Sequence, residues 1–188
     1  GKPAKIDSPR TAMRLVLAYV PEDRQHQGLL MPMSITTNMT LPMLPQLASF
    51  GWLRPRAERV RTLEYVEQLR IVLRQVEQPV AELSGGNQQK VVLSKWLMRA
   101  PRIVVLDEPT RGIDVGAKAE VHRLIGNLAA NGMAVLMISS ELPEILAMSD
   151  RVLVMREGRL VAELAREALS PERVMAAATG QVQQEARA

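Results

Sequence analysis

Short apolar runs bounded by turn residues recur along the chain and predict strands. They lie at about residues 15–20, 103–107, 134–138 and 151–156. The run at 103–107 (IVVLD) has no polar alternation, which is typical of a strand buried on both faces of a parallel sheet. We therefore expect parallel strands at these positions and an α/β fold.

Helical spacing fills the intervals between the predicted strands. Residues 34–80 are expected to be mostly helical and to include a basic amphipathic helix from about Arg56 to Leu73. A second helix begins within the segment LSGGNQQK, and a third runs from Ala117 to Asn131, before Gly132. The apolar stripe of the second helix is Val92, Leu93, Trp96 and Leu97. That of the third helix is Val121, Leu124, Ile125 and Leu128.

The C-terminal part is predicted to be a hairpin followed by a short helix. Residues 151–155 and 159–161 flank the turn residues Glu157-Gly158, and Ser170-Pro171 opens the helix. The last residues, 181–188, are expected to form a frayed tail.

The segment LSGGNQQK, Leu83–Lys90, combines a helix cap with two glycines. The hydroxyl of Ser84 is suited to cap a helix, and backbone amides at Gly85 and Gly86 can approach a large ligand closely. Such a helix start favours an anion, and a phosphate above all. On these residues alone, an ordinary glycine-containing turn that caps a helix explains the pattern equally well.

Two adjacent carboxylates, Asp107 and Glu108, end the apolar run at 103–107. The carboxyl ends of strands in open α/β sheets are where ligands bind. A capped turn is the alternative, since Asp-Glu-Pro is a fair turn sequence. Two neighbouring anions at a buried strand end are costly without a cation, so we favour a metal site.

Composition excludes several classes of protein. The chain is 47% hydrophobic and 23% charged, with a mean hydropathy of −0.03, and no apolar stretch approaches the roughly 18 residues of a membrane helix. No signal peptide is evident, and the absence of Cys rules out a disulfide framework and a thiolate metal site. The net charge of +4 is scattered and aromatic residues are 3%, which argues against nucleic acid as a partner. We expect a cytosolic protein.

Several motifs in a fixed order resemble the nucleotide-binding domain of an ABC transporter ATPase. They are LSGGNQQ, VVLDEPTRGID and ISSELPE. AYVPEDR, Ala18–Arg24, and the spelling LSGGNQQK resemble the second ATPase half of bacterial ribose, galactose, arabinose or autoinducer-type importers, in which both halves share one chain. The resemblance covers about residues 1–180. It implies a P-loop NTPase-type parallel sheet with an inserted helical subdomain and a C-terminal hairpin plus helix.

The resemblance also implies a division of the chain and a missing part. Residues 1–27 would be a partial ATPase core with the Q-loop, 28–82 the helical subdomain, 83–180 the signature helix and the rest of the core, and 181–188 the tail. No G-x-x-x-x-G-K-[ST] sequence occurs, so the phosphate-binding loop is absent. In the family it lies upstream, and we therefore expect the chain to be a fragment with an incomplete sheet.

Roles for particular residues follow from the same resemblance. Asp107 would hold Mg²⁺ and Glu108 would polarise the attacking water. The D-loop segment, Thr110–Asp114, would meet the opposite ATPase half through Asp114. The signature residues that would bind the nucleotide of the opposite half are Ser84, Gly85, Gly86, Asn87 and Gln88.

Two positions depart from the family pattern. Glu22 occupies the place of the Q-loop glutamine, and it lacks the amide donors of that residue. Ser140 stands where the family has a switch histidine, and a hydroxyl cannot carry the proton or charge of an imidazole. A plain loop carboxylate is the alternative for Glu22. The site built on Asp107 and Glu108 is therefore expected to be impaired.

The expected function is ATP binding and hydrolysis, with Mg²⁺, in the import of a sugar. The partners would be the other ATPase half and membrane permease subunits, at the cytoplasmic face of the plasma membrane. Met31, Met33, Met39 and Met43 in the helical subdomain suit either an adaptable docking surface or a core. Two other functions stay open: a non-transport ABC ATPase acting on nucleic acid, and a catalytically inert dimerisation half. Which sugar is carried is not encoded here.

Overall fold

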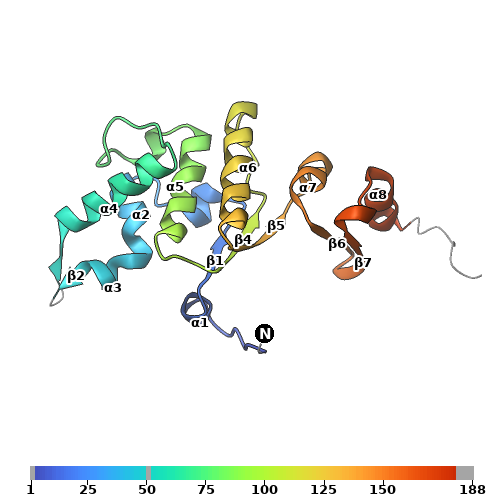
Figure 1. The fold of residues 1–188 in the computed structure, drawn as a ribbon. Coiled ribbons are helices and arrows are strands. Elements are labelled where there is room, and N and C mark those ends of the chain that lie inside the picture. Colours follow the sequence, from blue (N-terminus) through green and yellow to red (C-terminus); the bar gives the residue numbers. More distant parts are fainter. Residues whose placement is uncertain (1–2, 50–51, 181–188) are drawn as a thin grey trace, which may run out of the picture. The chain divides into compact units, whose positions relative to one another are not determined.

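The computed structural model describes residues 3–49 and 52–180. The chain divides into two compact units, the first ending at Ile138 and the second beginning at Ser139. Figure 1 shows the order of the elements along the chain.

A parallel sheet of three strands forms the centre of the first unit. Its order is β1 (Leu17–Val20), β4 (Ile103–Asp107) and β5 (Ala134–Ile138). These strands confirm three of the sequence predictions. The first begins at residue 17 rather than 15, because Leu15 is still the C-cap of helix α1 (Pro9–Arg14) and Val16 takes a positive φ of 55°.

The fourth predicted strand forms the predicted hairpin and is not part of the parallel sheet, so its inclusion among the parallel strands was wrong. β6 (Arg151–Arg156) lies in the second unit and pairs antiparallel with β7 (Arg159–Ala165). Both turn residues between them have positive φ, 51° at Glu157 and 75° at Gly158. This backbone suits the right-handed twist of a hairpin with a two-residue loop, so the chain reverses at once instead of crossing over.

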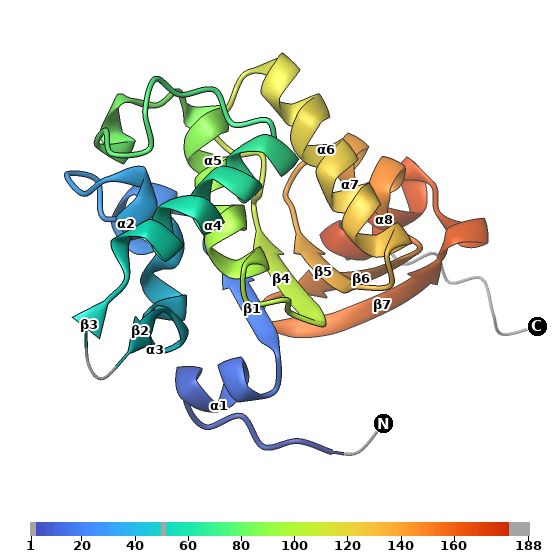
Figure 2. The same cartoon turned by 60° about the vertical axis from the view of Figure 1, so that its left-hand side comes forward.

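Two helices cover one face of the parallel sheet. α5 (Gly85–Leu97) contacts β1, and α6 (Val115–Ala130) contacts β5, on the same side of the sheet in Figure 2. Alternate strand residues are buried on that face: Ala18, Val20, Val104 and Leu106. The intervening residues point to the other face, where Tyr19, Ile103, Leu136 and Ile138 are 40–50% exposed.

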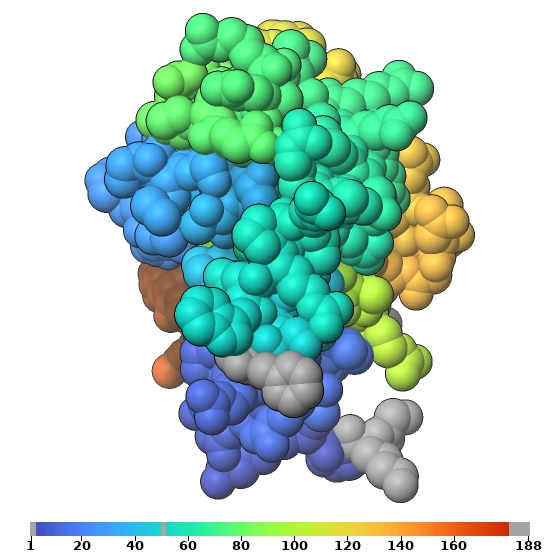
Figure 3. Space-filling view, turned by 90° about the vertical axis from the view of Figure 1, so that its left-hand side faces the viewer, coloured from blue at the N-terminus to red at the C-terminus, as the bar shows by residue number. Residues whose placement is uncertain are grey.

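The segment between β1 and α5 is mostly helical, as predicted for residues 34–80. It holds α2 (Ile35–Thr40), α3 (Leu44–Leu47) and α4 (Pro55–Gln68), the 3₁₀ turns at Leu41–Met43 and Val80–Glu82, and the short strands β2 (Ala48–Ser49) and β3 (Trp52–Leu53). Figure 3 looks onto this insertion. α4 ends at Gln68 rather than Leu73, and Arg70 beyond it has a positive φ of 50°.

The methionines of the insertion divide between core and surface. Met39 is fully buried and Met43 is 7% exposed, and α2 packs against both α4 and α5. Met33 is 45% exposed. The core interpretation therefore holds for Met39 and Met43, and an exposed docking role is left only to residues such as Met33.

The second unit is a hairpin covered by helices. α7 (Leu142–Met148) and α8 (Pro171–Thr179) pack on β6–β7 around Val152, Val154, Val174 and Ala177, with the 3₁₀ turn Arg166–Ala168 between β7 and α8. Ser170 caps α8, and Gly180 ends it with a left-handed backbone. Throughout the described ranges, no helix is long and apolar enough to cross a membrane.

Candidate functional site

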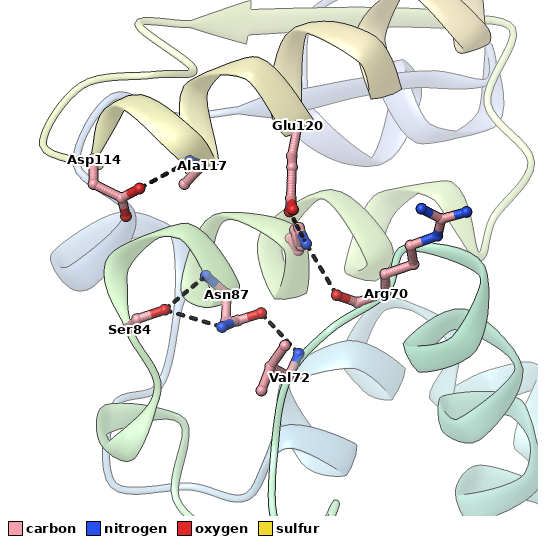
Figure 4. A network of polar contacts seen from close by, with 8 residues as sticks. Arg70, Val72, Ser84, Asn87, Asp114, Ala117 and Glu120 are labelled. Carbon is pink, nitrogen blue, oxygen red and sulfur yellow. Dashed lines mark hydrogen bonds and ion pairs between the residues drawn. The ribbon is translucent and has the colours of Figure 1, made fainter.

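The start of α5 is held by a local network around Ser84. The Ser84 hydroxyl accepts hydrogen bonds from the backbone N–H of Asn87, at 3.5 Å, and from its side-chain amide, at 3.0 Å. The Asn87 oxygen in turn accepts from the N–H of Val72, at 2.9 Å (Figure 4). Ser84 is exposed and Asn87 is half-buried. These bonds fix one conformation of the turn without using up the exposed face of the helix start.

The glycines of this turn allow close contacts inside the protein. An ideal Cβ at Gly86 would lie 2.6 Å from the Cβ of Ala117, near the start of α6. At Gly85 an ideal Cβ would lie 2.8 Å from an Arg24 guanidinium nitrogen. The sequence suggested that the glycines make room for a ligand; the structure shows that they make room for α6 and for Arg24.

Gln88 faces the interior rather than the exposed face of the turn. It is 4% exposed, and its amide donates to the carbonyl oxygen of Leu83 at 3.1 Å. Among the predicted signature residues, the structure therefore brings Ser84, Gly85 and Asn87 to the accessible side of the turn. Gln88 and Gly86 lie behind them, where they hold the turn in place.

Lys90, at the end of the same segment, is buried but paired. Its side chain is 8% exposed, and the ammonium forms an ion pair with Glu120 of α6 at 2.5 Å and donates to the Arg70 carbonyl oxygen at 3.0 Å. The hydrogen bond from Lys90 lowers the pKa of the Glu120 carboxyl, with Arg123 and Arg70 adding to the effect. Because a buried ammonium needs such partners, α5 is tied to α6 and to the end of α4.

The two predicted carboxylates are placed at the carboxyl end of the central strand. Asp107 is the last residue of β4 and accepts a hydrogen bond from the Tyr19 hydroxyl on β1, at 2.9 Å. That bond, together with burial, raises the pKa of Tyr19. Glu108 has a positive φ of 45°, a costly backbone for a non-glycine residue, while its N–H donates to the Ile138 carbonyl at 2.9 Å. Strain of this kind is common at functional sites.

Asp114 begins the helix that follows the carboxylates. Its side chain accepts from the N–H of Ala117 at 2.9 Å and so caps α6 (Figure 4). Because Ala117 also lies against Gly86, the capped start of α6 is packed beside the start of α5.

The segment after β1 reaches across to residues 111 and 112. Glu22 forms an ion pair with Arg111. Arg24 donates to the carbonyl oxygen of Arg111 at 2.8 Å and to that of Gly112 at 3.1 Å. Sequence reasoning singled out Glu22 but missed Arg24 and Tyr19. The string AYVPEDR contains both, yet nothing in it reveals which distant atoms they contact.

Ser140 belongs to the second unit and is exposed there. The neighbouring turn is held by Ser139, whose hydroxyl accepts from the N–H of Glu141 at 3.0 Å and donates to the carboxylate of Glu144. Glu144 is 4% exposed and lies in α7.

Comparison with known proteins decides the family. The family described as ABC transporter matches residues 2–111, more than half of the chain. The chain belongs to the ABC transporter family.

Curated relatives of this ABC chain are similar over almost its whole length. It is 56% identical over 180 residues to the ribose import ATP-binding protein RbsA of Rhodococcus jostii, and 57% identical over 180 residues to a protein of that name from Streptomyces coelicolor. Each match covers 96% of this chain and 36% of the relative. The chain therefore spans about a third of the length of these proteins.

Solved structures show that the fold is that of an ATP-binding cassette. An ABC transporter cassette in its ADP conformation matches with a TM-score of 0.71 and 23% identity, over 90% of this chain and 70% of that one. A dimeric cassette bound to ADP and Pi matches with a TM-score of 0.70 and 20% identity, over 86% of this chain and 68% of that one. The α/β fold with its parallel sheet, helices and hairpin is thus confirmed.

The carboxylate at the end of β4 in this ABC chain is a donor of the kind that Mg²⁺ accepts. No group of three or more His, Cys, Asp or Glu side chains suited to a metal occurs within residues 3–49 and 52–180. Mg²⁺ does not need such a group, since it is usually bound by one or two carboxylates together with substrate phosphates and water. Asp107, half-buried at the strand end, can supply one carboxylate oxygen.

Proposed function

We propose that this chain is part of the second ATPase half of a sugar-importing ABC transporter and presents its signature face to the nucleotide of the other half. The observation that carries the proposal is the start of α5, where an exposed Ser84 caps the helix beside Gly85 and Asn87. The relatives named as ribose import ATP-binding proteins support ribose or a similar sugar as the cargo.

The chemistry of this face is electrostatic. The N-terminus of α5 carries backbone N–H groups that lack a partner within the helix, as at every helix start, and the positive end of the helix dipole, both of which favour a phosphate. The Ser84 hydroxyl and the Asn87 amide add donors that the turn already holds in place. Donors fixed in advance stabilise charge that grows on a phosphoryl group during transfer, because they need no reorganisation.

Asp107 and Glu108 would serve a second nucleotide position, together with a phosphate-binding loop from elsewhere in the full-length protein. Bound Mg²⁺ would neutralise phosphate charge there. In this proposal Asp107, which accepts a hydrogen bond from the Tyr19 hydroxyl, would hold the metal, and Glu108 would accept the proton of the attacking water. By the family resemblance alone, Ser140 stands in the place of a switch histidine, and a hydroxyl cannot carry the proton of an imidazole, so slow turnover is a prediction from the sequence.

The remaining partners in the proposal are the other ATPase half and the permease subunits. Asp114 and the segment around it would face the other half, and the helical insertion would face the permeases. The protein would then act at the cytoplasmic face of the plasma membrane, as a peripheral subunit.

Substituting Ser84 in the full-length protein that carries this segment tests the proposal. Ser84→Arg would place a bulky cation where the phosphate is expected, and most Mg-ATP turnover should be lost. Ser170→Arg is the matched control, because Ser170 also caps a helix but lies in the second unit. A steady-state phosphate-release assay compares the two. Turnover in Ser84→Arg equal to that of Ser170→Arg would overturn the proposed signature role.

A further inference from the structure

Arg24 makes a two-pronged contact with the D-loop segment. One terminal nitrogen donates to the Arg111 carbonyl at 2.8 Å, and the other donates to the Gly112 carbonyl at 3.1 Å. A planar guanidinium can hold two acceptors at once, which a lysine ammonium does less rigidly. The contact spans 87 residues of sequence, so it joins two segments that are far apart along the chain.

The glycines on both sides leave space for this guanidinium. An ideal Cβ at Gly85 would lie 2.8 Å from one Arg24 nitrogen and 3.1 Å from the Gly112 carbonyl oxygen. Gly112 itself has a positive φ of 66°. An ideal Cβ at Gly112 would lie 3.8 Å from each terminal nitrogen of Arg24. Arg24 therefore lies where the signature turn and the D-loop segment come closest.

The turn that carries Arg24 is hydrogen-bonded to the signature helix α5. Arg24 opens the π-helical turn Arg24–Gly28, which Asp23 caps by accepting the N–H groups of Gln25 and His26. At the other end of this turn, the Gly28 carbonyl accepts a hydrogen bond from Lys95 of α5 at 2.9 Å.

A second link joins the same two segments. Glu22 pairs with the side chain of Arg111, whose carbonyl oxygen is one of the acceptors of Arg24. The Arg24 side chain is half-buried, and this burial lowers the pKa of its guanidinium. Its two acceptors are backbone carbonyl oxygens, so the contact bears on the backbone of the D-loop segment itself.

We propose that Arg24 is a positioning residue that fixes the D-loop segment against the signature turn, with the Glu22–Arg111 pair as a second link. The inference rests on the proposed function, because it assumes that this face serves ATP hydrolysis. Loss of the link should leave nucleotide binding almost unchanged, since phosphate affinity comes from a phosphate-binding loop outside this chain. It should lower the rate of the chemical step, because the donors would no longer be held in advance.

The first experiment measures kcat and KM for Mg-ATP in the full-length protein with Arg24→Met or Arg24→Lys. We expect kcat to fall by about tenfold or more in Arg24→Met with KM within about twofold, the pattern of an interaction made in the transition state. The kcat of Arg24→Lys should lie between that of Arg24→Met and that of the unchanged protein, because an ammonium keeps the charge but cannot hold two acceptors as rigidly as a planar guanidinium. Arg59→Met is the control: Arg59 forms an exposed ion pair with Glu77 in the same unit.

The second experiment exchanges the charges of the second link. Glu22→Arg and Arg111→Glu should each lower kcat, and the double variant should recover most of the loss. If Glu22 and Arg111 only stabilised the fold independently of each other, the double variant would not recover kcat. Thermal unfolding of each variant reports whether it is folded, and if Arg24→Met does not fold, this exchange decides the question.

The outcomes separate the two proposals. If Ser84→Arg abolishes turnover while Arg24→Met matches Arg59→Met in kcat, the positioning role is overturned and the proposed function stands. If Ser84→Arg itself retains turnover, the proposed function fails first. A folded double exchange variant with no more activity than either single variant also overturns the positioning role.

Discussion

At the scale of single residues, Gly86 has the tightest surroundings of the signature turn. A methyl group there would lie 2.6 Å from the Ala117 Cβ, a distance that real Cβ atoms essentially never show. The contact is between the first turns of two helices, where neither backbone can move without shifting its cap.

We expect Gly86→Ala to lower the free energy of unfolding by about 1–3 kcal/mol through overpacking. Gly126→Ala, in the middle of α6 with nothing within 4 Å, is the matched control and should be neutral or stabilising by about 0.4–1 kcal/mol. Denaturant unfolding of both variants provides the measurement. Ala117→Gly in the Gly86→Ala background should restore part of the loss, and equal effects of the two alanine substitutions would contradict the contact.

The pairing of Lys90 with Glu120 predicts a dependence of stability on pH. The folded pKa of Glu120 is lowered, so the pair contributes stability above the unfolded pKa and loses it as the pH falls through the folded value. The loss should therefore appear below about pH 4.3, the ordinary pKa of a glutamate.

Urea unfolding from about pH 6 to about pH 3 measures the free energy of unfolding, and proton linkage predicts that it falls as the pH falls. The free energy of unfolding should fall less steeply with pH in Glu120→Gln than in the unchanged chain. Glu64→Gln is the control, because Glu64 forms an exposed pair with Arg61 within α4. Identical pH profiles for Glu120→Gln and the unchanged chain would contradict the prediction.

At the scale of elements, the β6–β7 hairpin depends on two residues with positive φ. Gly158 accepts this backbone without cost, but Glu157 has a side chain and a φ of 51°. Turns of this kind prefer Asn followed by Gly. The sequence Glu-Gly is therefore not the best local choice for the turn that it forms.

We expect Glu157→Asn to raise the free energy of unfolding by up to about 1 kcal/mol, because Asn tolerates the left-handed region. Gly158→Val should lower it by about 1–2 kcal/mol for the opposite reason. Thermal unfolding followed by circular dichroism measures both. If Gly158→Val is as stable as the unchanged chain, the turn does not have the described backbone.

At the scale of the whole chain, the signature helix is present but no phosphate-binding loop is encoded. A helix dipole contributes typically about 0.3–1 kcal/mol, and the tight affinity of P-loop enzymes comes from a nest of backbone N–H groups and a lysine. Asp107 and Glu108 would repel a triphosphate further without that lysine.

We therefore expect the isolated 188-residue chain neither to bind Mg-ATP tightly nor to hydrolyse it. Calorimetric titration and a phosphate-release assay at high protein concentration measure this, with the full-length protein as the positive control. Micromolar affinity or steady turnover in the isolated chain would reveal a nucleotide site beyond the residues considered above.

Much of the fold follows from local sequence because its causes are local. The apolar runs of β1, β4 and β5 and the caps at Ser84, Asp114 and Ser170 depend on residues within a few positions of one another. Strand burial and helix starts are therefore readable from pattern and spacing. The order of the motifs was enough to identify the family.

The contacts that build the candidate site depend on segments far apart in sequence, so only the tertiary structure could decide them. Gly86 meets Ala117, and Arg24 meets the carbonyls of Arg111 and Gly112, because α5, α6 and the segment after β1 pack together. Residues 151–156 were placed among the parallel strands because an apolar run predicts a strand but not its direction, whereas the turn residues Glu157-Gly158 correctly predicted the hairpin. Local chemistry determined which elements form, and close packing between distant elements determined which side chains act together.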